Sequence, residues 1–420
     1  MTITANLGFP RIGVHRELKF ALESFWKGAS DADALQKVAV ELRRRHWELQ
    51  RDRGVSIIPS NDFLLYDHVL DTSIMLGAIP DRFKALRDGD PLDLYFACAR
   101  GTADAQAMEM TKWFDTNYHY IVPEFTRDQT FSLFRKKPVD DYLEAKALGI
   151  DTRPVLVGPL TWLGLGKSED EDFAPLDLLD ALLPVYAEIL TILRTVGAEW
   201  VHVDAPILAL DLDQSQRAGF QHAYRLLSAV APKIMLTSYF GGLEDNLALV
   251  AGLPVAGLHV DLVRAPDQID DVLAALSGSS KTLSLGLVDG RNVWRSNLAD
   301  KLEIARRAAD ALGADHVQIA PSCSLLHSPV DLVGETQLDD ELKSWLAFAT
   351  QKLEEIAVLG AALDSASSRA AVAFEASAAA AGVRRRSSRT TNPAVRDRAA
   401  AGTATDLKRD APYWERHERH

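Results

Sequence analysis

The stretch EWVHVDAPILALDLDQSQRAGFQHAYRLLSAVAPKIMLTSYF (residues 199–240) holds the repeating unit on which the predicted fold depends. Its two apolar runs, EWVHVDAP (199–206) and KIMLTSYF (233–240), have the length and composition of buried strands. Between them, apolar residues recur at helical spacing over Gln214–Val230. A strand, a helix and a second strand in succession are typical of parallel strands joined by a crossover helix.

The same alternation extends from about Ile3 to Leu326 and predicts a (β/α)8 barrel. The chain contains nine apolar runs with the character of strands, but eight strands close such a barrel. One run must therefore be irregular or lie outside the barrel, and we expect it to be the first run. A doubly wound open sheet is the competing architecture; the barrel is favoured because polar residues follow the strands repeatedly. The other seven runs are ITANLGF (3–9), VSIIPSNDF (55–63), NYHYIVP (117–123), RPVLVGPLTW (153–162), GLHVDLV (257–263), LSLGLVDG (283–290) and HVQIAPSCSLL (316–326).

The chain changes character after the predicted barrel. Further helices are expected at Asp31–Arg51, Leu176–Val196 and Leu298–Leu312, and an amphipathic helix at about Asp339–Leu363 closes the barrel. From there the sequence is rich in alanine, serine and arginine, which is typical of a solvated linker. We therefore expect a barrel with its closing helix over residues 1–363 and a helical or linker extension over 364–420, and we interpret the final APYWERHERH as the middle of a longer protein.

Composition excludes several classes of function. The formal net charge of −13 disfavours nucleic-acid binding, which needs a basic surface. No apolar run approaches the roughly 20 residues that span a bilayer, and MTITANLGFPRIG does not resemble a signal peptide, so a cytoplasmic protein without a membrane partner is expected. Cys98 and Cys323 are the only cysteines, which argues against a disulfide scaffold or a cysteine-rich zinc site.

The segment EMTKWFDTNYHY (109–120) concentrates polar and aromatic side chains, among them Lys112. A purely buried strand would satisfy so many polar groups only at high cost, so the segment favours a ligand contact. A loop whose tyrosines are hydrogen-bonded within the protein is the alternative.

Several longer motifs resemble the N-terminal half of cobalamin-independent methionine synthase. The match covers most of residues 1–400, and its specificity lies in the order of the motifs. The resemblance implies two face-to-face (β/α)8 barrels that move a methyl group from methyltetrahydrofolate polyglutamate to homocysteine, with zinc in the C-terminal barrel. The motifs are LGFPRIG, HRELKFALESFWKG, EMTKWFDTNYHYIVPEF, PVLVGPLTWL, GLHVDLV, GLVDGRNVWR and SCSLLHSPVDL.

The resemblance also implies a set of substrate-binding residues. The family's RELK motif is present as Arg16, Glu17, Leu18 and Lys19, and the lysine of EMTKWF is Lys112. The resemblance implies that both segments reach the glutamate tail of 5-methyltetrahydropteroyl-polyglutamate. An oligoglutamate is a string of carboxylates, which arginine binds bidentately and lysine as a point charge. An exposed helix face making weak local contacts is the alternative for the RELK segment.

The zinc ligands that the resemblance implies for the catalytic barrel are not all present here. In place of a His-x-Cys pair, the strand KIMLTSYF has Leu236, Thr237 and Ser238. Only Asp261 and Cys323 retain ligand-like groups at the corresponding positions, and they are weak vestigial candidates. His259 and His327 would complete a chemically acceptable set, but nothing in the sequence brings the two pairs together.

We therefore expect no catalytic residue and no cofactor in this chain, with zinc in a missing C-terminal catalytic barrel. The leading hypothesis is the folate-tail-binding scaffold barrel of such a synthase, a fragment that is inactive alone and that the catalytic barrel would follow in the complete enzyme. A stand-alone interaction protein that pairs in trans with a catalytic barrel is the second hypothesis. A third is a single-barrel methyltransferase with a divergent metal site.

The strand pattern also predicts where four side chains lie in the barrel. Asp204, Asp261, Asp289 and Cys323 should lie near the C-terminal ends of barrel strands, where ligand-binding residues of such barrels gather.

Overall fold

The computed structural model describes residues 2–168, 170, 172–364, 368–403, 406 and 408–419. Within these residues, an eight-stranded sheet has the order β1-β12-β11-β10-β9-β8-β6-β2, and its paired strands are parallel. Its strands are β1 (Ile3–Thr4), β2 (Ile58–Ser60), β6 (Thr152–Val157), β8 (Trp200–Asp204), β9 (Lys233–Thr237), β10 (Gly257–Asp261), β11 (Thr282–Val288) and β12 (Val317–Pro321).

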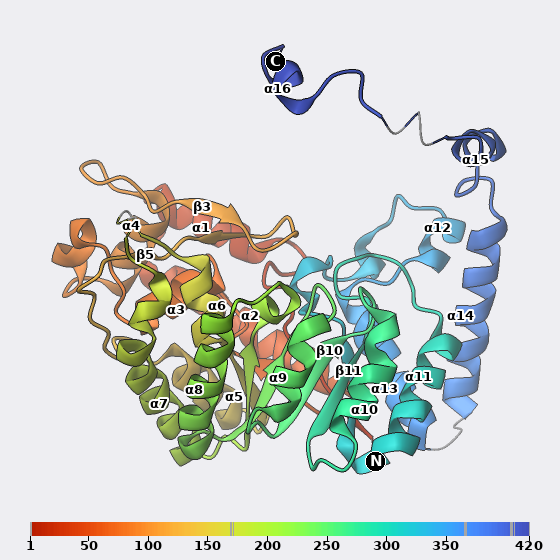
Figure 1. Cartoon of the computed structure of the whole chain (residues 1–420), viewed down its shortest axis with the longest axis horizontal. Coiled ribbons are helices and arrows are strands. Elements are labelled where there is room, and N and C mark those ends of the chain that lie inside the picture. Colours follow the sequence, from red (N-terminus) through yellow and green to blue (C-terminus); the bar gives the residue numbers. More distant parts are fainter. Residues whose placement is uncertain are drawn as a thin grey trace.

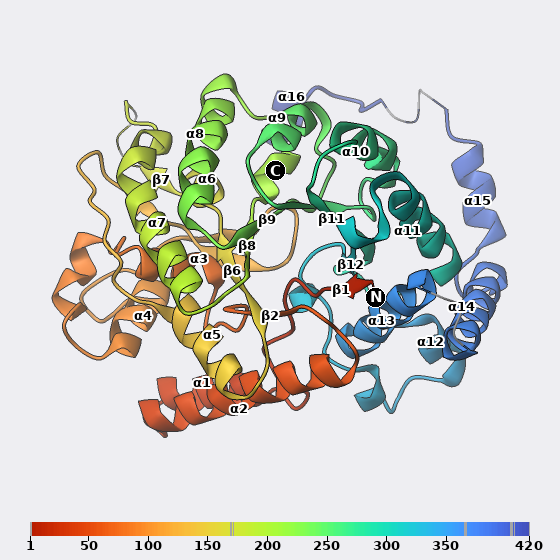
Figure 2. The same cartoon turned by 90° about the horizontal axis from the view of Figure 1, so that it is seen from below.

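The two edges of this sheet meet and close a barrel (Figures 1 and 2). Ala5 and Ile57 form a parallel bridge just beyond β1 and just before β2. The amide of Ile57 donates to the Thr4 carbonyl at 2.8 Å, and the amide of Asn6 donates to the Ile57 carbonyl at 3.0 Å. Because an open sheet would leave these edges apart, the predicted barrel is confirmed and the doubly wound alternative is wrong.

Helices surround the barrel and follow the predicted pattern closely. Gln214–Val230 and Leu298–Leu312 have the predicted bounds, and the first of them begins at a capping box made by Asp213 and Gln216. The helices before the extension are α1 (Glu17–Trp26), α2 (Ala32–Asp52), α3 (His68–Met75), α4 (Pro91–Arg100), α5 (Lys137–Ala147), α6 (Pro159–Leu165), α7 (Leu179–Thr195), α8 (Gln214–Val230), α9 (Leu247–Gly252), α10 (Ile269–Leu276), α11 (Leu298–Leu312), α12 (Asp340–Trp345) and α13 (Ala349–Asp364). None of the helices in the described residues has the length and apolar character needed to cross a lipid bilayer.

The run that lies outside the barrel is not the one predicted. The first run contains β1, which pairs with β12, whereas residues 117–123 contain β4 (His119–Ile121). This strand pairs antiparallel with β3 (Met110–Lys112) in a hairpin. The amide of Ile121 donates to the buried Asp67 carboxylate at 3.0 Å, so β4 is held beside α3. Its apolar residues are buried there, which made the run resemble a barrel strand. A further short pair joins β5 (Glu124–Phe125) and β7 (Lys167–Ser168).

The predicted closing helix over Asp339–Leu363 is broken into α12 and α13. Between them, Leu346 forms an antiparallel bridge with Trp294, and the amide of Ala347 donates to the Val293 carbonyl at 2.8 Å. Leu346 takes an extended conformation; its amide still donates to the Lys343 carbonyl at 3.2 Å, but the Ala347 amide pairs with the segment after β11, so the helix does not continue.

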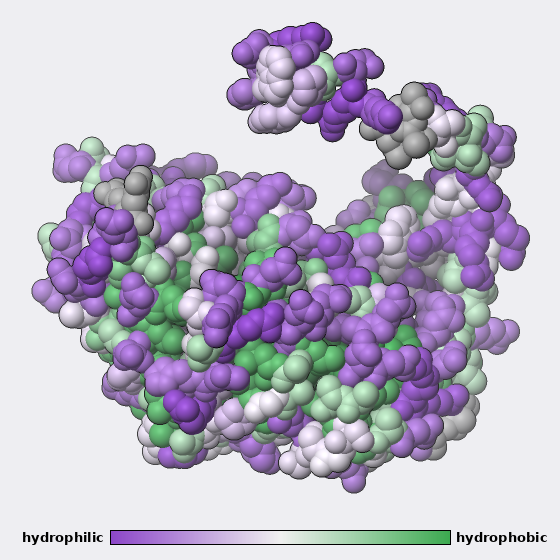
Figure 3. All heavy atoms as spheres, in the orientation of Figure 1, coloured by the Kyte–Doolittle hydropathy of each residue, from purple (hydrophilic) through white to green (hydrophobic). Residues whose placement is uncertain are grey.

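The segment expected to be a solvated linker is largely helical where the structure describes it. It contains α14 (Ser368–Arg386) and α15 (Pro393–Ala400), and α16 (Tyr413–His417) follows near the end. The buried Ser377 hydroxyl accepts from the Leu298 amide at 3.0 Å and donates to the Ser296 carbonyl at 2.7 Å, so α14 is docked on the start of α11. Beyond α14 the chain turns over the end of the molecule where α1 and β3 lie (Figure 1), and this tail carries mostly hydrophilic residues (Figure 3). Residues 365–367, where the expected domain boundary falls, lie outside the described residues.

Candidate functional site

The strand ends carry the side chains that the sequence predicted there. Asp204 is the last residue of β8 and Asp261 the last residue of β10, while Asp289 directly follows β11 and Cys323 lies two residues after the end of β12. Because the strands are parallel, these four residues lie at one end of the barrel, as predicted.

The two vestigial metal candidates are occupied by other interactions. The Asp261 carboxylate accepts from the amides of Phe240 at 3.0 Å and of Val263 and Arg264, both at 2.9 Å. Burial raises the pKa of the Cys323 thiol well above its usual value, with the Asp261 and Asp289 carboxylates acting in the same direction. A thiolate is therefore disfavoured where zinc would require one.

The histidines do not complete a metal set either. His259 is fully buried, with its Nδ1 2.9 Å from the Ser284 hydroxyl and its Nε2 3.3 Å from the Ser322 carbonyl. Since the carbonyl can only accept, Nε2 carries the proton and Nδ1 accepts from Ser284. Within the described residues, no group of three or more His, Cys, Asp or Glu side chains is arranged to hold a metal ion. Asp261 and His259 are thus hydrogen-bonded within the barrel, and Cys323 is fully buried there.

A small cavity lies at the same end of the barrel, and His68, Asp71, Asp204 and His327 are among the residues that line it. Its volume of about 40 Å³ gives room for about three water molecules. Burial lowers the pKa of His68 to about 3 and that of His327 to about 4, so both imidazoles are neutral at physiological pH.

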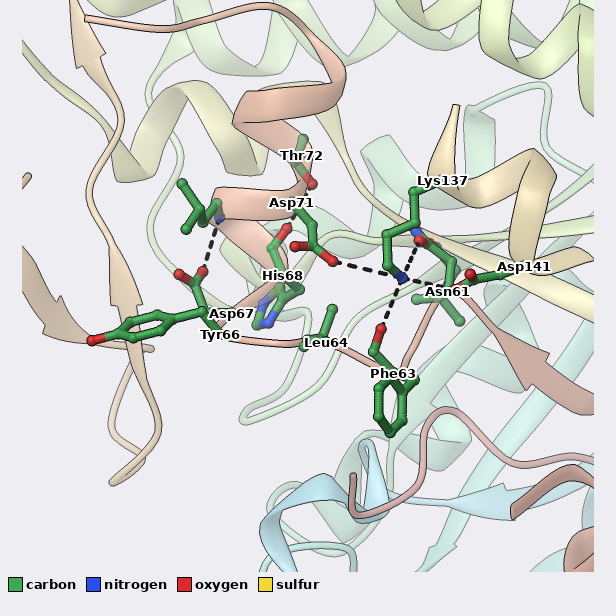
Figure 4. Close-up of polar contacts among 12 residues, drawn as sticks. Asn61, Phe63, Leu64, Tyr66, Asp67, His68, Asp71, Thr72, Lys137 and Asp141 are labelled. Carbon is green, nitrogen blue, oxygen red and sulfur yellow. Dashed lines mark hydrogen bonds and ion pairs between the residues drawn. The ribbon is translucent and has the colours of Figure 1, made fainter. Parts of the chain in front are cut away.

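Charged side chains beside this cavity are neutralised within the protein. Lys137 on α5 donates to the Asp141 carboxylate at 2.7 Å, to the side-chain amide oxygen of Asn61 at 3.1 Å and to the Phe63 backbone carbonyl at 2.8 Å, and it lies 3.6 Å from the Asp71 carboxylate (Figure 4). Burial acts to lower the pKa of Lys137, but Asp141 and Asp71 outweigh it and the pKa is raised. These contacts join α3 and α5 to the loop after β2.

The β3–β4 hairpin is tied to the loops at the strand ends. Asp115, in the turn of the hairpin, accepts from Arg264 at 2.8 Å and from Arg291 at 2.7 Å, and Arg291 also donates to the Asp115 carbonyl at 3.1 Å. Trp113 is 1% exposed and its ring meets that of His68 edge-on at 4.2 Å. The hairpin is therefore a fixed element over the β10 and β11 ends of the barrel.

Within EMTKWFDTNYHY, both tyrosine hydroxyls contact other residues of the protein, whereas the lysine side chain is exposed. The Tyr118 hydroxyl lies 3.3 Å from His68 Nδ1, and the Tyr120 hydroxyl donates to the Leu165 carbonyl at 3.0 Å. Lys112, on β3, is exposed and forms no ion pair with any described residue. The segment thus combines hydrogen-bonded tyrosines with one exposed cation.

The RELK segment begins α1, and its four side chains have different surroundings. Arg16 is exposed, precedes the helix with φ of 60°, and has no ion-pair partner among the described residues. Lys19 is exposed and lies 3.2 Å from Glu23 one turn on. Leu18 is 1% exposed and packs in the core, and Glu17 forms an ion pair with Arg45 on α2 at 2.6 Å.

Both cationic segments lie at the same end of the molecule. Figure 1 shows α1 and β3 at the same end of the molecule, the end toward which the barrel strands run. The sequence did not indicate that Arg45 pairs with Glu17, or that Asp115 pairs with Arg264 and Arg291. Their partners are 28, 149 and 176 residues away in the chain, and no local pattern reports such pairings.

Fold and surface together define a (β/α)8 barrel protein with exposed cations at the C-terminal ends of its strands. The family described as "Cobalamin-independent synthase, N-terminal domain" matches residues 3–313, and the chain belongs to this family.

Relatives among characterised proteins agree with this assignment. The chain is 52% identical to a 5-methyltetrahydropteroyltriglutamate–homocysteine methyltransferase of Caulobacter vibrioides, over 100% of this chain and 56% of the relative. It is 53% identical to the protein of the same name from Xylella fastidiosa strain 9a5c, over 99% and 55% of the two chains. The chain spans about half the length of these relatives.

Solved structures share the fold at low sequence identity. A B12-independent methionine synthase from Shewanella sp. W3-18-1, in complex with selenomethionine, has a TM-score of 0.63 at 12% identity and covers 87% of this chain and 98% of its own. A putative vitamin-B12 independent methionine synthase from Listeria monocytogenes has a TM-score of 0.58 at 14% identity, over 86% and 99% of the two chains.

Proposed function

We propose that this chain is the barrel that binds the polyglutamate tail of methyltetrahydrofolate in a two-barrel, cobalamin-independent methionine synthase. The observation that carries the proposal is the presence, in a member of this family, of the RELK and EMTKWF motifs, whose Arg16 and Lys112 are exposed and have no ion-pair partner among the described residues. The relatives' name, which specifies a pteroyltriglutamate, supports the same substrate.

The charges of this chain favour an anionic ligand only where exposed cations are gathered locally. The formal net charge is −13, so an oligoglutamate is repelled by the protein as a whole. Arg16, Lys19 and Lys112 present cations on one end of the barrel, where a tail can be bound locally. Because each of these contacts is exposed, it contributes about 1 kcal/mol or less, and the binding weakens with salt.

Catalysis itself belongs, in this proposal, to a second barrel that carries the zinc and homocysteine sites. The bonding of Asp261 and His259 and the raised pKa of Cys323 support this division, because each group serves the barrel's own structure. The partner barrel is joined either in cis or in trans.

Calorimetric titration of the 420-residue chain with 5-methyltetrahydropteroyl triglutamate and monoglutamate tests the binding. We expect the triglutamate to bind more tightly, and Arg16→Ala and Lys112→Ala each to reduce this preference about fivefold or less. Lys27→Ala removes another exposed cation, at the end of α1, and is the matched control that should leave the preference unchanged. Equal affinity of the parent chain for the two folates would contradict the proposal.

A methyl-transfer assay with the triglutamate, homocysteine and zinc tests the division of labour. The chain alone should give no methionine above the uncatalysed rate. Turnover at the rate of a full-length relative would show that the chain holds a complete active site.

A further inference from the structure

The RELK segment contains one residue whose backbone conformation is unusual for its type. Arg16 adopts φ of 60° and ψ of 33°, in the left-handed region. This conformation costs a residue with a Cβ about 1 kcal/mol or more, and it persists only where surrounding contacts hold it. Arg16 is also the residue whose exposed guanidinium the proposed tail contact needs, so the contacts that hold its backbone decide where that group points.

Glu17 makes the contacts that hold this turn. Its Oε2 accepts from the His15 amide at 2.9 Å, and its Oε1 accepts from Arg45 Nη2 on α2 at 2.6 Å. The turn closes with the Arg16 amide donating to the Gly13 carbonyl at 3.1 Å. The carboxylate thus ties the residue before Arg16 to a neighbouring helix.

Gly13 makes room for this carboxylate. A Cβ at Gly13 would lie 2.1 Å from Glu17 Oε2 and 2.9 Å from a Leu42 methyl group, and its φ of +80° also favours glycine. The turn, the carboxylate and α2 therefore fit together only with glycine at this position. Burial acts to raise the pKa of Glu17, but the hydrogen bonds from Arg45 and the backbone outweigh it, and the pKa is lowered.

We propose that Arg45, with Glu17, is a positioning residue that fixes Arg16 toward the folate tail and does not touch the tail itself. This inference rests on the proposed function and deepens it. It assigns the glutamate of the RELK motif to the protein's own structure, and it adds Arg45, which lies outside every motif that the sequence singled out.

A double-mutant cycle in the 420-residue chain tests the proposal. The readout is the ratio of the affinities for 5-methyltetrahydropteroyl triglutamate and monoglutamate, because a general loss of structure would lower both alike. Arg45→Ala should reduce the ratio about threefold, since the Glu17–Arg45 pair is partly exposed, whereas in the Arg16→Ala background it should cause no further loss.

Matched variants separate this role from general effects. Arg44→Ala removes the adjacent arginine, which pairs with Glu41 and Glu48 on its own helix, and should leave the ratio unchanged. Arg45→Lys keeps a cation near Glu17 and should restore most of the ratio. Glu17→Gln keeps an acceptor for the His15 amide but loses the ion pair, and it should reproduce the loss if Arg45→Ala does not fold.

Three outcomes would overturn the inference in distinguishable ways. Equal losses in the parent and Arg16→Ala backgrounds would mean that Arg45 binds the tail directly. An unchanged ratio in Arg45→Ala, with a reduced ratio in Arg16→Ala, would reject the positioning role and leave the proposed function standing. An unchanged ratio in Arg16→Ala would reject the proposed function together with the inference.

Discussion

At the scale of single residues, the interior of the barrel contains polar side chains that bond to other groups of the protein, although the buried Nε of Arg153 has no hydrogen-bond partner among the described residues. Arg153 on β6 is 3% exposed and reaches across the interior to Gln318 on β12, at 3.4 and 3.3 Å, while its guanidinium lies 5.2 Å from the Trp200 ring. His259 bonds to Ser284 and Ser322. Such groups are costly to bury, and these contacts offset part of that cost.

His259 should make the stability of the protein depend on pH. Burial lowers its pKa from 6.5 to about 3, so below pH 6.5 the unfolded chain takes up a proton that the folded chain does not, and stability falls as pH falls. Glutamine can keep both hydrogen bonds without titrating. Between pH 6.5 and 5, His259→Gln should lose about 1.5 kcal/mol less unfolding free energy than the parent, measured by urea unfolding.

Other groups also titrate between pH 6.5 and 5. The test is therefore the difference between the variant and the parent in how the unfolding free energy changes with pH. Asp62 and Asp67, whose pKa values burial raises to about 7, act in the opposite direction in both proteins. Parallel profiles for the variant and the parent would show that His259 is not a buried neutral imidazole.

The two cysteines should resist thiol reagents in the folded protein. Cys323 is 0% and Cys98 1% exposed, and burial raises the pKa of Cys98 to about 12 and that of Cys323 well above its usual value. Because the thiolate is the reactive form, we expect no labelling by a chromogenic disulfide in native buffer and two thiols per chain in denaturant. Rapid labelling of one thiol before unfolding would contradict the packing around that cysteine.

At the scale of elements, the β3–β4 hairpin has its tip fixed by a single carboxylate. Asp115→Ala removes the ion pairs to Arg264 and Arg291. Since each exposed pair contributes about 1 kcal/mol or less, backbone amides of the hairpin should exchange about fivefold faster with deuterium, while the barrel strands keep their protection.

Asp128→Ala is the control for this change. Asp128 is exposed, follows β5, and its side chain has no hydrogen bond or ion pair with any described residue. Unchanged exchange in Asp115→Ala would mean that Trp113 and the contacts of β4 alone hold the hairpin.

At the scale of the whole molecule, the start of the chain is tied to the last helix before the extension. The Asp364 carboxylate, at the end of α13, accepts from the Thr2 amide at 2.7 and 2.8 Å and from the Thr2 hydroxyl at 2.7 Å. Thr2 is 7% exposed, so removing the carboxylate leaves nearly buried donors without a partner. Asp364→Ala should lower the unfolding free energy by about 1–3 kcal/mol in urea unfolding.

A matched change on another helix controls for the loss of a surface charge. Asp310 on α11 is exposed and has no hydrogen bond or ion pair among the described residues, and Asp310→Ala should change stability by less than about 0.5 kcal/mol. If the two variants were equally stable, the tie between Thr2 and Asp364 would not contribute to the fold.

The sequence by itself determined the barrel, the bounds of α8 and α11, and the place of Asp204, Asp261, Asp289 and Cys323 at the strand ends. These features follow from local periodicity, because alternating apolar runs and helical stretches report which residues are buried. Such periodicity does not show which element a buried run packs against. For that reason residues 117–123 resembled a barrel strand, and the break in the helix between α12 and α13 was not predicted.

Only the tertiary structure decided which segments meet. The bridge from Ala5 to Ile57 closes the barrel, Arg45 reaches Glu17 from another helix, and Asp115 joins the hairpin to loops more than a hundred residues away in the chain. These contacts depend on the packing of distant elements, and any exposed arginine or aspartate has the same local sequence signal whether or not a partner lies opposite it.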